Sequence, residues 1–133
     1  MPESHGELTD AQYRELLAVR TTLRRFLRWS EEQARAAGLT PAQHQLMLAV
    51  RGHADSRGPT IGEVAEALLV RHHSAVELAD RAVKAGLVRR VADRDDERVV
   101  RLRLTEPGAR RLRKLSAAHL AELGRLRAAS PWI

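Results

Sequence analysis

Residues 91–105, Val-Ala-Asp-Arg-Asp-Asp-Glu-Arg-Val-Val-Arg-Leu-Arg-Leu-Thr, place a charge-dense tip between two short segments that contain regularly spaced apolar residues. These apolar residues are Val88 and Val91 before the tip, and Val100, Leu102 and Leu104 after it. Alternation of this kind is typical of strands that have one face on a hydrophobic core. We therefore predict a β-hairpin whose other face carries Arg101 and Arg103.

A short amphipathic helix is expected directly before the hairpin, from about residue 72 or 73 to Gly86. Four small or apolar residues share one arc of about 100° on it and should face the core: Ala75, Leu78, Ala79 and Ala82. An earlier helix is predicted to begin at Thr60, where Thr-Ile-Gly-Glu63 has the form of a capping box, and a turn at 69–72 would join the two. Helix, turn, helix and basic hairpin together predict a winged helix-turn-helix, an arrangement that reads duplex DNA.

Two long helices are expected at the ends of the chain, at about 9–37 and 106–128, on either side of a DNA-binding lobe at about 40–104. Thr9, Thr40 and Thr105 have the form of residues that begin helices. A helix of about 27 residues spans roughly 40 Å, which is more than a small lobe can cover. Its apolar stripe therefore needs a second surface, and we expect a homodimer that buries the stripes of both subunits. The predicted fold is one domain (1–133), mainly α with a small β-hairpin wing.

The composition narrows the class of protein. Residues 71–114 hold 13 Lys and Arg against 7 Asp and Glu, whereas residues 1–70 hold 8 against 9. A basic segment of this kind attracts a polyanion.

The chain has no cysteine, which excludes disulfides and thiolate metal sites. No apolar run approaches the roughly 18–20 residues that cross a bilayer, and the start lacks a signal-peptide pattern, so we expect a cytoplasmic protein. No catalytic motif is found, and we expect neither enzymatic activity nor a cofactor.

The helix expected from about residue 72 or 73 to Gly86 is the second helix of the motif, called the recognition helix, and it offers two kinds of DNA contact. Residues near the amino terminus of such a helix reach base edges, and here these are His72, His73, Ser74, Val76 and Glu77. Three basic residues are better suited to phosphate contacts: Arg71, Arg81 and Lys84. Glu77 has an alternative role as the capping-box partner of Ser74. Asp80 is expected to pair within the protein with Arg81 or Lys84.

The order of these elements resembles the MarR family of bacterial transcription factors over about residues 8–126. The matching strings are Leu39-Thr-Pro-Ala-Gln43, Thr60-Ile-Gly-Glu-Val-Ala-Glu-Ala-Leu68, Asp80-Arg81 with Ala85-Gly-Leu-Val-Arg-Arg90, and Asp93…Asp96-x-Arg98…Leu104-Thr-Glu-Pro-Gly108. The resemblance implies a homodimeric repressor or activator whose DNA affinity often responds to a small molecule. A repressor on an inverted-repeat operator is the form that we expect.

The wing departs from the family pattern at one position. The family commonly has Asp-x-Arg-Asp-x-Arg, and Asp95 stands here where the first arginine is expected. The tip is consequently net negative, which leaves Arg98, with Arg94 second, to enter a minor groove. Alternatively, Arg98 pairs with Asp93 or Asp96 and only braces the wing.

The resemblance also implies a ligand crevice between the dimerisation helices and the lobe. Five residues there would suit an aromatic or anionic effector: Arg24, Arg28, Trp29, His44 and Met47. A metal site is a weaker alternative, based on the six histidines His5, His44, His53, His72, His73 and His119. His44 and His119 are predicted to lie on different helices that meet near this crevice. The rival interpretations of the chain are a winged-helix protein-interaction module and a sequence-blind architectural DNA binder.

Overall fold

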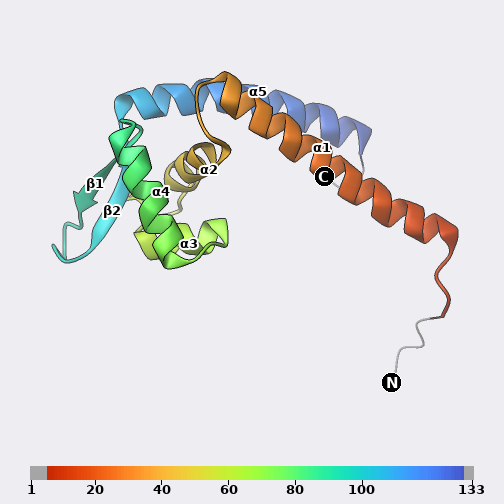
Figure 1. The fold of residues 1–133 in the computed structure, drawn as a ribbon, viewed down its shortest axis with the longest axis horizontal. Helices are drawn as coiled ribbons and strands as arrows, with labels where there is room; N and C mark the ends of the chain where they lie inside the picture. Colours follow the sequence, from red (N-terminus) through yellow and green to blue (C-terminus); the bar gives the residue numbers. More distant parts are fainter. Residues whose placement is uncertain (1–5, 131–133) are drawn as a thin grey trace.

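A computed structural model describes residues 6–130, so His5 lies outside the described residues. These described residues form five helices and one hairpin. Figure 1 shows their arrangement. The elements are α1 (Asp10–Ala36), α2 (Pro41–Arg51), α3 (Ile61–Leu68), α4 (His72–Lys84), β1 (Val88–Ala92), β2 (Val100–Leu104) and α5 (Glu106–Ala129). The fold class is therefore as predicted, a mainly α protein with one antiparallel hairpin.

Side-chain caps fix the beginnings of four helices. Thr9, Thr40 and Thr60 each accept a hydrogen bond from the amide three residues on, at 3.2, 3.0 and 3.2 Å. The side-chain oxygen of the Gln or Glu at that position accepts in turn from the amide of the threonine. Thr105 accepts from the amide of Gly108 at 3.0 Å. Each cap satisfies backbone N–H groups that have no partner inside the helix. The predicted helix starts are thus confirmed.

The turn of the helix-turn-helix depends on one residue in the left-handed region. Leu69 has φ of 55° and ends α3, and the next amide, of Val70, donates to the carbonyl of Ala65 at 3.1 Å. A left-handed residue after a helix closes its last turn and redirects the chain. Helix α4 begins three residues after Leu69, and α3 and α4 pack against each other at a steep angle (Figure 1).

The core lies inside the lobe formed by α2, α3, α4, the hairpin and the start of α5. Ala75, Ala79 and Ala82 of α4 are fully buried, as the helical arc predicts. The largest fully buried side chains are Leu46, Met47, Leu87, Leu102, Val64, Val88 and Pro59. These contacts hold α4 and the wing against the same hydrophobic centre.

The hairpin register corrects two expectations about its faces. Val88 pairs with Leu104 and Val91 pairs with Arg101, so Val88 and Val91 lie on opposite faces of the ribbon. Val100 is 40% exposed because it lies at the wing end of β2, beyond the core. Leu102 and Val88 carry the buried face.

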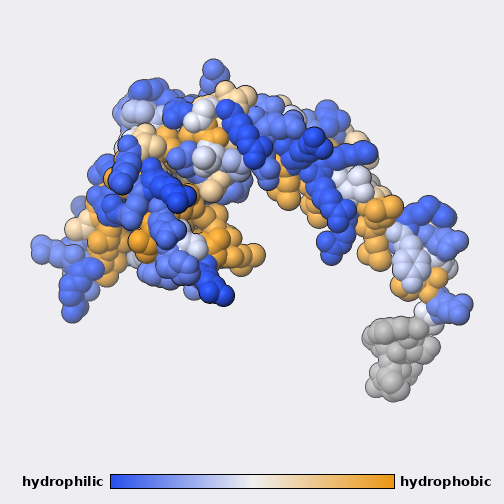
Figure 2. All heavy atoms as spheres, viewed as in Figure 1, coloured by the Kyte–Doolittle hydropathy of each residue, from blue (hydrophilic) through white to orange (hydrophobic). Residues whose placement is uncertain are grey.

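The end helices leave the lobe and expose apolar residues. The amino-terminal half of α1 extends away from the lobe (Figure 1), and Figure 2 shows hydrophobic residues gathered along its lower side. The exposed apolar side chains on α1 and α5 include Tyr13, Leu16, Leu17, Leu23, Leu27 and Leu120. No helix within residues 6–130 has the length and apolarity that a membrane span requires.

Candidate nucleic-acid interface

The start of α4 presents a polar surface to solvent. His72, His73 and Glu77 are exposed, and Ser74 and Val76 are half-buried. The three residues expected at phosphates, Arg71, Arg81 and Lys84, are also exposed. Because Ala75, Ala79 and Ala82 turn one arc of this helix to the core, its opposite face is the one exposed to solvent.

Two expected contacts of α4 differ in the structure. The capping box between Ser74 and Glu77 does not form, because α4 already begins at His72 and its N-cap is Arg71, without a side-chain cap. Asp80 forms its ion pair with Arg90 of β1, and not with Arg81 or Lys84. Arg90 lies across from Leu102 in the hairpin register and reaches α4 at the edge of the lobe. This pair joins the recognition helix to the wing and leaves Arg81 and Lys84 free for another partner.

Asp93 organises the root of the wing. Its side chain is only 6% exposed, and one carboxylate oxygen accepts from Nε of Arg101 at 2.7 Å. The other oxygen accepts from the amides of Asp95 and Asp96, both at 3.1 Å. The hydrogen bond from Arg101, followed by those from the two amides, lowers the pKa of Asp93. Asp93 is therefore held as a carboxylate that folds the wing loop, residues 93–99.

Arg101 consequently does not face solvent as the alternation predicted. Its side chain is 13% exposed, and Nη1 donates to the carbonyl of Gly58 at 2.8 Å. The segment before α3 runs along β2, with the Leu102 amide donating to the Pro59 carbonyl at 2.8 Å, so position 101 is covered. Arg103 remains exposed, and its Nη1 donates to the carbonyl of Ser56 at 3.1 Å.

Arg57 is a member of the site that the sequence analysis missed. It comes from the polar loop 52–59, and Nη1 lies 3.3 Å from Asp93 and 3.4 Å from Asp95. Its hydrogen bonds to Asp55 lower the pKa of that carboxyl well below its usual range. In a single sequence nothing distinguishes Arg57 from any other loop arginine, because its partners lie 36 and 38 residues away.

The wing tip is less acidic than its sequence indicates. Arg57 and Arg101 come from outside the tip and pair with its carboxylates Asp93 and Asp95. Arg98 holds Asp96 through two side-chain hydrogen bonds of 3.0 and 3.2 Å, and this pairing lowers the pKa of Asp96. The bracing alternative for Arg98 is thus present, although the side chain is still 90% exposed.

Arg94 differs from the other wing arginines. It is exposed and takes part in none of the wing's ion pairs among the residues that the structure describes. Arg94 and Arg98 therefore both point a positive charge at solvent from the tip. Arg98 is hydrogen-bonded to Asp96, whereas Arg94 has no ion pair within the wing among the described residues.

The expected effector residues are only partly brought together. A cavity of about 320 Å³ lies between α1, α2 and α5 and is lined by Phe26, Leu27, Ser30, His44, Gln45, Leu48, Ser116, His119, Leu120 and Leu123. Of the five expected residues only His44 lines it. Trp29 lies beside it, with its ring centroid 4.8 Å from that of His119.

The other three expected effector residues lie elsewhere. Met47 is fully buried in the core, three residues beyond His44 on α2. Arg24 is exposed, and Arg28 pairs with Glu32 along the outer surface of α1 at 3.4 Å. Among the residues that line the cavity there is no arginine, so the charge partner expected for an acidic effector does not line it.

His44 and His119 meet as predicted, with ring centroids 4.8 Å apart. Nε2 of His119 lies 2.7 Å from Oγ of Ser30, whereas the buried Nδ1 of His44 has no hydrogen-bond partner. Burial, followed by the charge of His119, lowers the pKa of His44. Within the described part of the chain no group of three or more His, Cys, Asp or Glu side chains could hold a metal ion.

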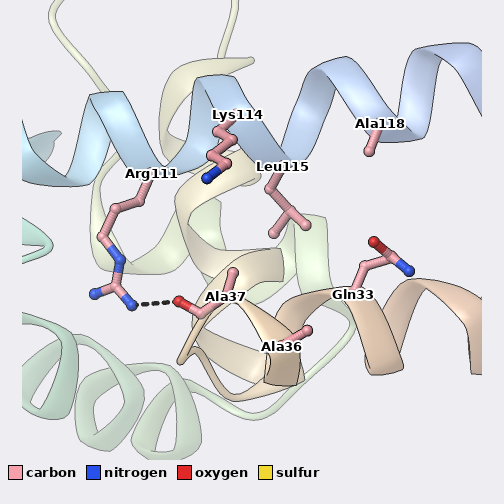
Figure 3. Close-up of a pocket in the computed structure, with 7 residues that line it drawn as sticks. All are labelled: Gln33, Ala36, Ala37, Arg111, Lys114, Leu115 and Ala118. Carbon is pink, nitrogen blue, oxygen red and sulfur yellow. Dashed lines mark hydrogen bonds between the residues drawn. The ribbon is translucent and has the colours of Figure 1, made fainter.

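A second cavity, of about 430 Å³, lies between the end of α1 and the first half of α5 (Figure 3). Arg111 crosses its edge and donates from Nη2 to the carbonyl of Ala37 at 2.7 Å. An arginine at this point satisfies a carbonyl that the end of α1 leaves free. Its role is to join the two long helices, and the sequence analysis did not single it out.

Comparison with known proteins agrees with this architecture. A sequence model of the MarR family matches residues 37–99, which include the helix-turn-helix and most of the wing. The solved structure of a MarR family protein from Bacillus stearothermophilus is similar with a TM-score of 0.75 and 24% identity, over 90% of this chain and 82% of that one. The structure of a Staphylococcus aureus MepR mutant bound to an oligodeoxyribonucleotide is similar with a TM-score of 0.68 and 19% identity, over 92% and 84% of the two chains.

A curated relative covers only part of this fold. The LexA repressor of Magnetococcus marinus is 42% identical over 55 residues, which is 40% of this chain. The match spans about a quarter (24%) of the length of that relative. Residues 37–99 thus match the sequence model of the MarR family, and the described residues have the winged helix-turn-helix fold of the solved MarR family structures.

Proposed function

We propose that this chain is a sequence-specific DNA-binding regulator of transcription that acts as a homodimer, as a repressor on a pseudo-palindromic operator. One observation carries the proposal. The exposed start of α4 and the wing tip lie on the same side of the lobe, away from α5 (Figure 1). A helix of this kind enters a major groove while the wing reaches the neighbouring minor groove or backbone.

Each contact residue has a role in this proposal. His72, His73, Ser74, Val76 and Glu77 read base edges, with Val76 against a thymine methyl and Glu77 accepting from a cytosine amino group. Arg71, Arg81 and Lys84 bind phosphates, which position the protein without specifying sequence. Arg98, oriented by Asp96, enters the minor groove, and Arg94 supports it. That a MepR structure holds an oligodeoxyribonucleotide supports a DNA-binding role for the shared fold.

The homodimer is proposed from the apolar residues that one protomer leaves uncovered. Leu17 is 62% exposed and Leu120 is 69% exposed, and both lie on the long helices outside the lobe. Burial of these apolar side chains between two protomers contributes about 25 cal/mol per Å² of apolar surface removed from water, and the cost of association is subtracted from this gain. A two-fold pair of lobes would then place two recognition helices about one DNA turn apart, which suits an inverted repeat.

An effector that releases the DNA is a further part of the proposal. It would bind the cavity lined by His44 and His119, beside Trp29. The lining favours an aromatic body, with a polar group at the histidine pair. Because Arg24 and Arg28 do not line this cavity, an anionic group would need the histidines as its partner. The proposal also places the protein in the cytoplasm. It includes neither catalytic activity nor a cofactor.

The test is a selection of random DNA duplexes by the purified protein at low and at about 0.2 M salt. An enriched inverted repeat that survives added salt would support the regulator. Binding without enrichment would instead indicate a sequence-blind architectural protein, and its affinity would fall steeply with salt. If no DNA is retained at either salt, the protein-interaction alternative replaces the proposal.

A further inference from the structure

We propose that Arg57 and Arg101 hold Asp93 in a wing-root clamp, and that this clamp positions the wing for DNA without itself contacting DNA. The clamp is defined by these three residues. Its consequence for DNA binding rests on the proposed function, whereas its effect on the wing is a property of the protein alone. The two can therefore be tested separately.

The first step is that Asp93 controls the shape of the wing loop. Its Oδ2 accepts both loop amides, from Asp95 and Asp96, while its own amide donates to the carbonyl of Val99 at 2.9 Å. One residue thus closes the loop from both ends. A carboxylate that accepts several such bonds imposes one turn geometry on a short segment.

The second step is that the two arginines tie this loop to the helix-turn-helix. Arg101 reaches back to the carbonyl of Gly58, and its Nη1 lies 3.8 Å from Glu63 in α3. Arg57 approaches Asp93 from the loop that precedes α3. Gly58 has φ of +93°, and an added Cβ there would overlap the carbonyl oxygen of Leu102, so the loop lies directly on β2. Loop 52–59, α3 and the wing root are therefore joined by direct contacts.

Burial of the clamp determines how much the loss of one of its members changes the wing. The side chain of Asp93 is 6% exposed and that of Arg101 is 13% exposed, whereas the Arg98–Asp96 pair lies at the surface. Exposed pairs contribute little, but the loss of one partner from a buried pair leaves an uncompensated charge. Without Arg101, the charged partner left to Asp93 is Arg57, at 3.3 Å. The carboxylate would then be held less firmly, which loosens the loop that presents Arg94 and Arg98.

The clamp also affects the charge that the wing presents. It keeps the carboxylate of Asp93 buried beside two arginines, and Arg57 also lies 3.4 Å from the exposed Asp95. Carboxylates that pointed outward would repel the phosphates that the wing approaches. Arg57 and Arg101 are thus positioning residues, and they explain how an acidic wing sequence serves a DNA-binding fold.

The direct test measures wing mobility without DNA. Because the chain has no cysteine, Glu97→Cys gives one labelling site at the tip for a nitroxide spin label. Arg101→Gln should increase the mobility of the label, seen as narrowed lines in the electron paramagnetic resonance spectrum. The matched control is Arg103→Gln, two residues along the same strand, which loses only its bond to the carbonyl of Ser56. An unchanged spectrum in Arg101→Gln would overturn the clamp.

A second variant distinguishes a mobile wing from a protein that has failed to fold. Asp93→Asn keeps an oxygen for the loop amides but removes the charge that holds Arg57 and Arg101. It should raise label mobility in the same way while far-ultraviolet circular dichroism shows a helical content equal to that of the parent. Equal label mobility in Asp93→Asn and the parent would also overturn the clamp.

The consequence for DNA is tested with a double-mutant cycle on a duplex that the parent binds. Arg101→Gln should weaken binding about tenfold, and Arg98→Ala should cost less in that background than in the parent, because both act through the wing. Fully additive losses would overturn the link between the clamp and Arg98. If the parent binds no duplex, the proposed function fails, while the spin-label result still decides the clamp.

Discussion

Oγ of Ser30 on α1 lies 2.7 Å from Nε2 of His119 on α5, and the ring of His119 packs against that of His44 on α2. This contact is where the two long helices meet the lobe. The ring of Trp29 also packs against that of His119, and Nδ1 of His119 lies 2.8 Å from the carbonyl oxygen of Leu115. Since Nδ1 of His44 is buried without a partner, protonation there adds a charge that no neighbour compensates.

The His44 environment predicts that stability falls on acidification. Burial and the neighbouring His119 lower the pKa of His44 in the folded protein, so the unfolded chain binds more protons below its ordinary pKa of about 6.5. The free energy of unfolding should therefore fall, by up to roughly 1.4 kcal/mol per pH unit, as the pH drops below about 6.5. His44→Gln should reduce this slope in urea denaturation at fixed protein concentration, whereas the exposed His72→Gln should keep it. Equal slopes in His44→Gln and the parent would contradict this account.

The apolar surface of α5 predicts the oligomeric state. Leu120→Asp should convert the proposed dimer into monomers, because a charge buried against a second apolar surface has no partner there. Sedimentation equilibrium measures the change. Leu69→Asp is the matched control, since Leu69 is 92% exposed in the turn between α3 and α4. If Leu120→Asp still sediments as a dimer, that part of α5 lies outside the interface.

The wing tip predicts unequal roles for its two exposed arginines. Arg98→Ala should weaken operator binding by about 1–3 kcal/mol, because Asp96 holds its guanidinium ready for the groove. Arg94→Ala should cost less, because that side chain is not oriented beforehand. Fluorescence anisotropy on operator and on random duplex gives both values. Unchanged affinity in Arg98→Ala would reduce that residue to a brace of the wing.

Arg81 is predicted to act on every sequence alike. Its side chain is exposed on α4, and a phosphate contact contributes without distinguishing bases. Arg81→Ala should lower affinity for operator and random duplex by the same factor and reduce the slope of log affinity against log salt by about 1. Lys114→Ala, exposed on α5, should leave both quantities unchanged. A loss confined to the operator would assign Arg81 to base readout instead.

Two glycines in α5 predict opposite effects of the same substitution. An added Cβ at Gly108 would overlap the carbonyl oxygen of Leu87, a backbone atom that cannot move aside, so Gly108→Ala should destabilise the lobe by about 1–3 kcal/mol. Gly124 has open space around that point, and Gly124→Ala should stabilise the helix by about 0.5–1 kcal/mol. Thermal melting of both variants compares them. Destabilisation of equal size in both would show that contact with Leu87 is not the cause.

Sequence by itself determined the elements and their order. Three Thr-x-x-Gln/Glu boxes and Thr105 begin four helices, and the spacing of Ala75, Ala79 and Ala82 identifies the buried arc of α4. These signals are local, because a cap or a helical arc depends on residues within a few positions. Hydrophobic alternation likewise predicted the hairpin. It did not predict that Val91 lies on the face opposite Val88.

Only the tertiary structure decided which charges meet. Arg57 lies beside Asp93, Arg101 turns inward to the same carboxylate, and Asp80 pairs with Arg90. Packing also buried Met47 and left Arg28 on the outer surface of α1, away from the cavity that was expected to hold both. Charged side chains are long, so each has many possible partners in the sequence. Burial is costly for an unpaired charge. The packing of the backbone around the buried Asp93 therefore selects the arginines that pair with it.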